Sequence, residues 1–263
     1  MTHPPDQRTL DQLINVALCE ADEDAVWQAV YTLQRRGDRE VLERADELSV
    51  SNCFRERELA AWILGDLGAP ERIFRRRCLQ ILTAMLQPDE EPSVLASVLT
   101  AVSHYEHRLV SQVVSCAGHA DAGVRLGVVN ALSGQEDPQA IAGLISLSSD
   151  PEVEVRDWAT FGLGTLTDVD TPVLRAALAA RLDDPDLETR LEAILGLARR
   201  RDERVCEIVA QELTAPDVCD DILEAAENLA DQRLHPLLLA LQEPGRENIA
   251  PLERAIAACA PCF

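Results

Sequence analysis

The stretch "DPEVEVRDWATFGLG", residues 150–164, returns twice more along this chain in altered form. The other copies are "HADAGVRLGVVNALS" from His119 and "DPDLETRLEAILGLA" from Asp184. Each copy places an arginine at the same point, at positions 125, 156 and 190, which are 31 and 34 residues apart. Self-similarity at a period of about 20 to 50 residues is the signature of a repeat architecture. The fold is therefore expected to be an array of such units.

The spacing of small and apolar residues inside the stretch predicts a helix that packs closely on its neighbours. One face at the 3.6-residue period carries Val155, Ala159, Gly162 and Leu163. By the same period, the opposite face is expected to carry Asp157, Thr160, Phe161 and Gly164. The preceding Asp-Pro is expected to supply the N-cap and a proline in the first helical turn. A ladder of Asp–Arg pairs between repeats would explain the recurring arginines without any ligand.

Further apolar periodic segments lie between the copies, for example residues 139–149 and 172–182, and weaker copies of the template occur on both sides. Helix, short turn and helix, repeated at about 30 to 35 residues, describes an α-solenoid. Strand patterns are nearly absent. We expect an all-α solenoid of about eight helix pairs, forming a single domain over residues 10–263 after a flexible lead-in at 1–9.

The segment "VRDWATFGLG", Val155–Gly164, with Asp-Pro five residues before Val155, resembles a HEAT repeat. More narrowly, it is similar to the bacterial HEAT-like repeats first named from phycobilisome lyases. The resemblance spans roughly Leu10–Ala258 and is strongest over Asp121–Arg201. It implies a right-handed superhelix in which the second helix of each pair lines a concave face, used mainly to hold other proteins. Such a motif is specific for the fold and unspecific for the function.

The charge balance narrows the classes of partner. The 263 residues include 46 acidic and 24 basic side chains, all of the latter arginine, for a net charge of -22. Such a surface disfavours binding to nucleic acid and to anionic membranes and favours a basic partner protein. The polar, proline-containing segment after Met1 does not predict a signal peptide, and no apolar run approaches the ~18 residues of a membrane span. The eight scattered cysteines are then expected to be reduced, which is typical of a cytoplasmic protein.

A set of apolar and acidic positions on the second helices forms the candidate binding site. Trp158 is expected to be half buried, and Phe161 is expected to line the concave groove. The carboxylates of Asp157 and Glu192 would orient a basic partner. The predicted partner-binding residues are Trp158, Phe161, Asp157, Trp62, Leu126, Leu191, Leu195 and Glu192. The alternative for each aliphatic residue is ordinary core between neighbouring helices.

The sequence gives little support for a metal site, a redox site or a catalytic site. "HYEH" (His104–His107) and "CAGH" (Cys116–His119) have ligand-like spacing, but the helix expected between them keeps one ion from reaching both. "CAPC" (Cys259–Cys262) has redox-motif spacing without the strand and helix that accompany such motifs. No nucleophile elbow, phosphate loop or HExxH motif occurs. No catalytic residue, metal site or cofactor is therefore predicted.

The sequence favours a non-enzymatic scaffold that holds a basic partner protein or helix in its concave groove. One alternative is an inhibitory or immunity protein that occludes a toxin or an enzyme. A second is a bilin lyase-like chaperone, which rests on the family resemblance alone. A nucleic-acid enzyme is disfavoured by the net charge. The identity of the partner and the oligomeric state stay open.

Overall fold

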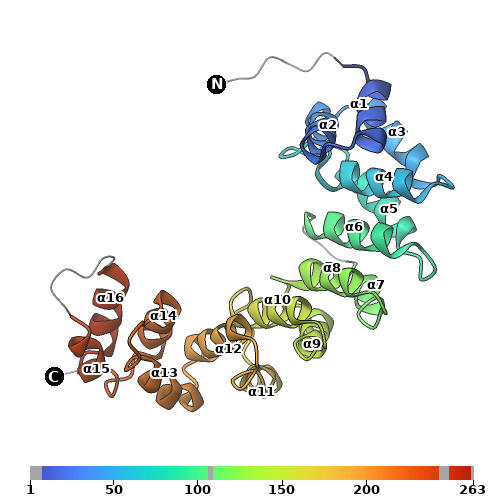
Figure 1. Cartoon of the computed structure of the whole chain (residues 1–263). Coiled ribbons are helices and arrows are strands. Elements are labelled where there is room, and N and C mark those ends of the chain that lie inside the picture. The colour runs from blue at the N-terminus through green and yellow to red at the C-terminus, as the bar shows by residue number, and fades with distance from the viewer. Residues whose placement is uncertain (1–7, 106–108, 243–248, 262–263) are drawn as a thin grey trace. The chain divides into compact units, whose positions relative to one another are not determined.

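The computed structural model describes residues 8–105, 109–242 and 249–261 (Figure 1). Within these ranges the chain forms sixteen α-helices, one short 3-10 helix (η1, Glu203–Val205) and no strand, so the predicted all-α class is confirmed. Successive helices pack in eight pairs, from α1 with α2 to α15 with α16. The chain divides into two compact units, Met1–Leu132 and Ser133–Phe263. The single domain over 10–263 stays a prediction.

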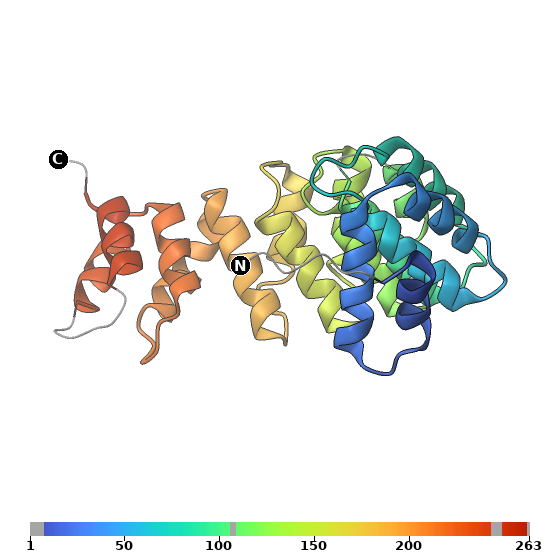
Figure 2. The ribbon, with the colours of Figure 1, turned by 90° about the horizontal axis from the view of Figure 1, so that it is seen from above.

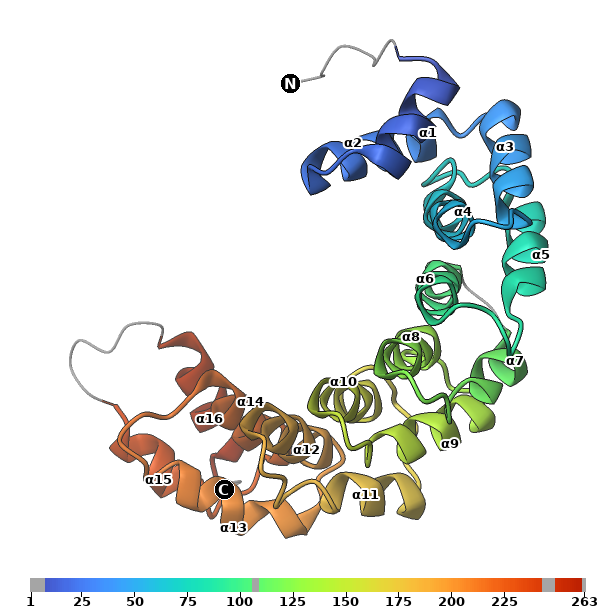
Figure 3. The ribbon, with the colours of Figure 1, turned by 45° about the vertical axis from the view of Figure 1, so that its right-hand side comes forward.

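The first unit consists of four helix pairs. Its second helices α2, α4, α6 and α8 pack on one another in turn, and α3, α5 and α7 lie along one side of that row (Figure 3). The helices are α1 (Leu10–Cys19), α2 (Glu23–Arg36), α3 (Arg39–Ser49), α4 (Phe54–Asp66), α5 (Arg75–Met85), α6 (Pro92–Ser103), α7 (Val110–Ser115) and α8 (Ala122–Leu132). The core lies between the two rows, where small and aliphatic residues of both meet.

The second unit repeats this plan. Its second helices α10, α12, α14 and α16 stack in sequence, and Figure 2 shows the pairs as successive layers. The helices are α9 (Pro138–Leu147), α10 (Val153–Gly164), α11 (Pro172–Ala179), α12 (Leu187–Arg199), α13 (Cys206–Glu212), α14 (Asp220–Leu229), α15 (His235–Ala240) and α16 (Ala250–Cys259).

The small residues of the repeat determine how closely α10 and α12 approach. Val155, Ala159 and Leu163 are at most 1% exposed, as the periodicity predicts. The opposite face differs from the expectation, because Thr160 and Gly164 are also buried. The physical reason is lateral packing: a Cβ on Gly196 of α12 would lie 2.5 Å from the Cα of Gly164. A second helix of this array therefore buries its flanks as well as its inner face.

The Asp-Pro signal has two outcomes in the structure. Asp137 caps α9 by accepting a hydrogen bond from the Gln139 backbone N–H at 2.7 Å, with Pro138 in the first turn, as predicted. Ahead of α10 the expectation is wrong by about half a turn. Asp150 instead accepts from the Glu152 N–H at 3.0 Å, and Glu152 takes the N-cap position. The Asp-Pro pair there belongs to the connecting turn.

Arginine ladders link successive repeats, as the sequence predicts. Arg156 donates to both carboxylate oxygens of Asp184 in the next repeat, at 2.8 and 3.1 Å, and to the Asp150 carbonyl at 2.7 Å. Arg57 makes the equivalent pair with Glu90 at 2.9 and 2.6 Å and donates to the Ser51 carbonyl at 2.7 Å. Arg57 and Arg156 thus join the loops of neighbouring repeats, whereas Arg190 donates to the Asp184 carbonyl of its own repeat at 2.6 Å.

Candidate protein-interaction site

The predicted site residues divide between the two units. Trp62 on α4 and Leu126 on α8 belong to the first unit, whereas the other six lie on α10 and α12 of the second. Those two helices pack directly on each other, so the structure brings the six together. We call the exposed and half-exposed part of α10 and α12 around these six residues the α10/α12 face.

An aromatic pair occupies the centre of the α10/α12 face. The rings of Trp158 and Phe161 meet edge to face, with centroids 5.6 Å apart and planes at 87°. Residues three apart on a helix lie on one side of it, which lets these rings touch. Trp158 is 47% exposed and Phe161 is half buried. Both aromatics therefore offer apolar surface that the fold leaves uncovered.

Two carboxylates border this aromatic pair. Burial, together with the nearby charges of Asp157 and Asp221, raises the pKa of the Glu192 carboxyl to about 7. Burial likewise raises the pKa of Asp157, and its Oδ1 atom is buried with no hydrogen-bond partner in the described ranges. Thr165 Oγ1 donates to Glu192 Oε2 over a long 3.5 Å. A hydrogen bond from Thr189 and the charge of Arg156 lower the pKa of Asp157 only in part, so burial still leaves that pKa raised. No arginine of the described chain forms an ion pair with Asp157 or Glu192.

The aliphatic members contribute unequally to the surface. Leu191 is half buried, whereas Leu195 is only 8% exposed and packs among the helices. The apolar surface of the α10/α12 face therefore consists mainly of Trp158, Phe161 and Leu191.

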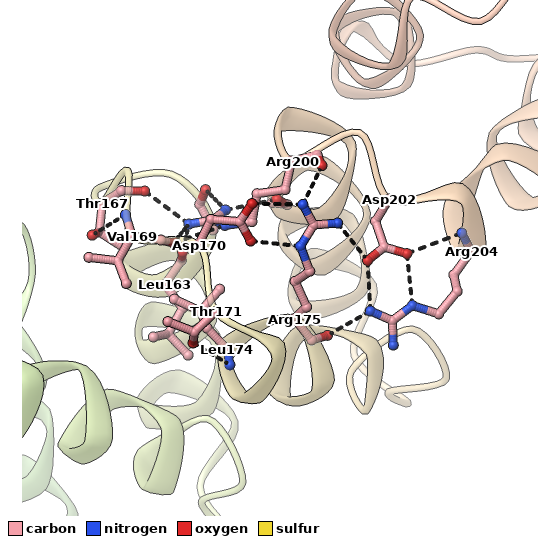
Figure 4. Close-up of polar contacts among 12 residues, drawn as sticks. Leu163, Thr167, Val169, Asp170, Thr171, Leu174, Arg175, Arg200, Asp202 and Arg204 are labelled. Atoms are coloured by element: carbon pink, nitrogen blue, oxygen red, sulfur yellow. Dashed lines mark hydrogen bonds and ion pairs between the residues drawn. The ribbon is translucent and has the colours of Figure 1, made fainter.

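A half-buried arginine links the two helices. Arg200 donates to the carbonyls of Leu163 and Gly164 at the end of α10, at 2.9 and 3.0 Å, and to that of Gly196 in α12 at 2.8 Å (Figure 4). These carbonyls lie at helix C-termini, where a cation complements the helix dipole. Arg200 thus ties the C-terminal end of α10 to that of α12.

Trp62 in the first unit belongs to an aromatic cluster that the sequence analysis missed. Its ring lies 5.0 Å from that of Trp27 on α2, and Trp27 lies 6.5 Å from Tyr31. Trp27 and Tyr31 are spaced four residues apart on a helix, a signal that could have identified them. The repeat template does not mark Trp27 and Tyr31, because the N-terminal repeat departs from it. Leu126 on α8 is half buried.

The candidate metal and redox motifs have ordinary roles where they are described. His104 Nδ1 lies 2.9 Å from Asp66 Oδ2, and His119 Nδ1 accepts from the Asp121 N–H at 3.0 Å. Cys259 is buried, its pKa is raised to about 11 by that burial, and its thiol donates to the Ala226 carbonyl. His107 and Cys262 lie outside the described residues. Within the described ranges no three His, Cys, Asp or Glu side chains gather as metal ligands would.

Among the helices in the described ranges, none combines the length and the apolar character that crossing a bilayer requires.

Comparisons with known proteins identify the family. Residues 79–164 and 141–230 match the sequence profile of HEAT repeats. Protein YibA of Escherichia coli K12 is 31% identical over 213 residues, covering 78% of this chain and 75% of YibA. The X-ray structure of E. coli YibA matches with a TM-score of 0.82 at 28% identity, over 95% of this chain and 92% of that one. An engineered protein shares the fold at a TM-score of 0.59 and 16% identity, over 94% and 77% of the two chains. The chain therefore belongs to the HEAT-repeat family, and its fold is the helical solenoid that the sequence predicts.

Proposed function

We propose that this HEAT-repeat protein binds a basic segment of another protein on its α10/α12 face and performs no covalent chemistry there. One observation carries the proposal. The half-exposed Trp158–Phe161 pair lies beside two carboxylates, Asp157 and Glu192, that no arginine of the described chain neutralises. HEAT solenoids commonly serve as interaction scaffolds, and the repeats provide extended binding surfaces.

The chemistry of the face favours a partner that carries both apolar and cationic groups. Exposed aromatic residues are enriched among those that dominate the energy of protein interfaces. A lysine or arginine placed beside Glu192 would stabilise its ionised form and lower its raised pKa. Binding would then release protons near neutral pH. The partner class is thus a basic amphipathic helix or loop.

The test uses affinity capture with matched variants of the full chain. Phe161→Ala removes half of the aromatic pair, and the double change Asp157→Asn with Glu192→Gln removes the charges at nearly constant volume. Phe54→Ala is the matched control, since Phe54 is an exposed aromatic of the first unit. We expect one basic protein that wild type and Phe54→Ala capture and the other two variants lose, while all four keep their helicity and melting temperature.

Equal capture of the partner by wild type and all three folded variants would refute binding at the α10/α12 face. If Phe161→Ala instead lowers the free energy of unfolding by the ~3–5 kcal/mol of a buried phenylalanine, that ring is core. The identity of the captured protein also separates the alternatives: a toxin or enzyme favours the inhibitory role, and a chromophore-bearing protein favours the lyase-like role.

A further inference from the structure

A second aromatic cluster lies in the first unit, on helices other than those of the α10/α12 face. It consists of Trp27 and Tyr31 on α2 and Trp62 on α4. The chain has only three tryptophans and two tyrosines, so three of these five side chains gather at one place. Trp27 is 42% exposed and Tyr31 is 59% exposed, whereas Trp62 is half buried beneath them. We call these three rings the α2/α4 aromatic cluster.

The rings are held in place by the packing of α2 on α4. Gln34 Nε2 of α2 donates to the Trp62 carbonyl at 2.8 Å, and the Trp62 indole N–H donates to Ser97 Oγ of α6 at 3.0 Å. The C-terminal ends of both helices meet at two glycines, where a Cβ on Gly37 would lie 2.6 Å from the Cα of Gly68. The Trp62 ring and the two helices are therefore held in place, which reduces the conformational entropy lost on binding.

A carboxylate lies at the edge of the cluster. Glu58 precedes Trp62 by one turn of α4, which puts both side chains on the same side of that helix. Ser97 Oγ joins them, because it accepts from the Trp62 indole and donates to Glu58 Oε1 at 3.5 Å. Burial raises the pKa of Glu58, and the Ser97 hydrogen bond and the charge of Arg55 lower it only in part. No arginine of the described chain forms an ion pair with this carboxylate.

The same unit contains an aromatic ring that is already covered by a cation. The guanidinium carbon of Arg72 lies 4.8 Å from the centroid of Tyr105, a stacked cation–π arrangement. The three rings of the α2/α4 aromatic cluster carry no such cation from the part of the chain that the structure describes. An aromatic surface with an adjacent uncompensated carboxylate is complementary to a positive group from another molecule.

We propose that the α2/α4 aromatic cluster, with Glu58 at its edge, is an anchor for an arginine side chain of a partner protein. The geometry favours a flat group stacked on the outer ring faces. Trp27 and Trp62 touch each other at 5.0 Å with planes tilted by 39°, which leaves no gap between them to enclose a rounded ammonium group. A guanidinium is planar, is weakly hydrated, stacks on aromatic faces and pairs with a carboxylate at its rim. Lysine offers none of the stacking.

This inference deepens the proposed function, because it rests on the same proposal that the chain holds a basic protein segment. It names the side chain that is recognised, and it uses neither α10 nor α12. The two sites can therefore fail separately. Each contains at least one tryptophan, so the indole N–H signals of Trp27, Trp62 and Trp158 report on them individually.

The experiment is an NMR titration of the full chain labelled with 15N, in which the three indole signals are assigned with Trp27→Phe and Trp158→Phe variants. The probe is an acetylated, amidated Gly-Arg-Arg-Gly peptide. The control peptide replaces both arginines by citrulline, which keeps the shape and removes the charge. We expect saturable shifts of the Trp27 and Trp62 signals with the arginine peptide. Affinity should fall by about four- to twenty-fivefold with citrulline, because it loses both an exposed cation–π contact and the ion pair with Glu58, each worth about two- to fivefold.

Variants separate the anchor from general charge attraction by this acidic chain. Glu58→Gln should weaken binding of the arginine peptide by about two- to fivefold through loss of the rim carboxylate. Glu207→Gln, a matched change at an exposed position of α13, should leave it unchanged. The anchor is refuted if the two peptides shift Trp27 and Trp62 equally, if neither does so, or if both glutamine variants behave alike. A shift of Trp158 alone would refute the anchor while leaving the α10/α12 proposal standing.

Discussion

At the scale of single residues, buried charge pairs and unpaired carboxylates have opposite consequences for this protein. Arg156 and Asp184 are 9% and 2% exposed and satisfy each other with two hydrogen bonds. Glu192 and Asp157 are partly buried without any such partner in the described ranges. The pairs hold repeats together, whereas the unpaired groups make the native state less stable when they ionise.

The Arg156–Asp184 pair should be among the most sensitive contacts between repeats. Asp184→Asn leaves the buried guanidinium without its countercharge, a loss that typically costs about 3 kcal/mol or more. The change would be measured as the free energy of unfolding in urea. Glu43→Gln is the control, since Glu43 pairs with Arg39 on the surface at 61% and 81% exposure and should lose less than about 0.5 kcal/mol. An equal loss of unfolding free energy in Asp184→Asn and Glu43→Gln would contradict a stabilising role for the Arg156–Asp184 pair between repeats.

Glu192 should make stability depend on pH near neutrality. Its folded-state pKa of about 7 lies above the ordinary 4.5, so the native state binds more protons between these values and stability falls as pH rises through them. Glu192→Gln should therefore exceed wild type in free energy of unfolding at pH 8, by about 1–2 kcal/mol after allowing for partial exposure. The difference in free energy of unfolding between the variant and wild type should be smaller at pH 5.5. Urea unfolding at pH 5.5 and pH 8 measures this difference, and a difference independent of pH would disprove the prediction.

At the scale of helices, contact between glycines sets the spacing of α10 and α12. Gly196→Ala would place its Cβ 2.5 Å from the Gly164 Cα, so the helices must separate. We expect a loss of about 1–3 kcal/mol, the usual cost of overpacking a well-fitted contact. Gly118→Ala meets nothing within 4 Å and should change stability by less than about 0.5 kcal/mol. Similar melting temperatures for the two variants would show that the contact is looser than described.

Much of the helix packing could be predicted from the sequence, because the template repeats both its period and its small residues. Val155, Ala159 and Leu163 are core as expected, and Arg156 pairs with the next repeat as expected. The lateral burial of Thr160 could not be predicted, since one helix's periodicity does not say that neighbours flank it on both sides. Of the candidate site, the exposure of Trp158 was predictable. The Trp27–Trp62 contact could not be predicted, because it joins two repeats and the pattern within either repeat does not indicate it.

At the scale of the whole molecule, the net charge of -22 should govern how fast a basic partner associates. Charge of one sign steers an oppositely charged partner and raises its association rate constant, an effect that salt screens. We expect the association rate constant to fall at least about tenfold between about 50 mM and 500 mM salt, with a smaller change in the dissociation rate constant. Surface plasmon resonance with the captured partner measures both. An association rate constant insensitive to salt would exclude electrostatic steering.

The most direct test of the central claim places a photo-crosslinker in the proposed face. A benzoylphenylalanine at position 161 of the full chain in living cells should yield one discrete crosslinked protein. The same group at position 54 should not, and Asp157→Asn with Glu192→Gln should abolish the product at 161. That pattern is the predicted result. Three results would contradict binding at the α10/α12 face. They are no crosslinked product at position 161, the same product at positions 54 and 161, and a product at 161 that persists when Asp157 and Glu192 are replaced.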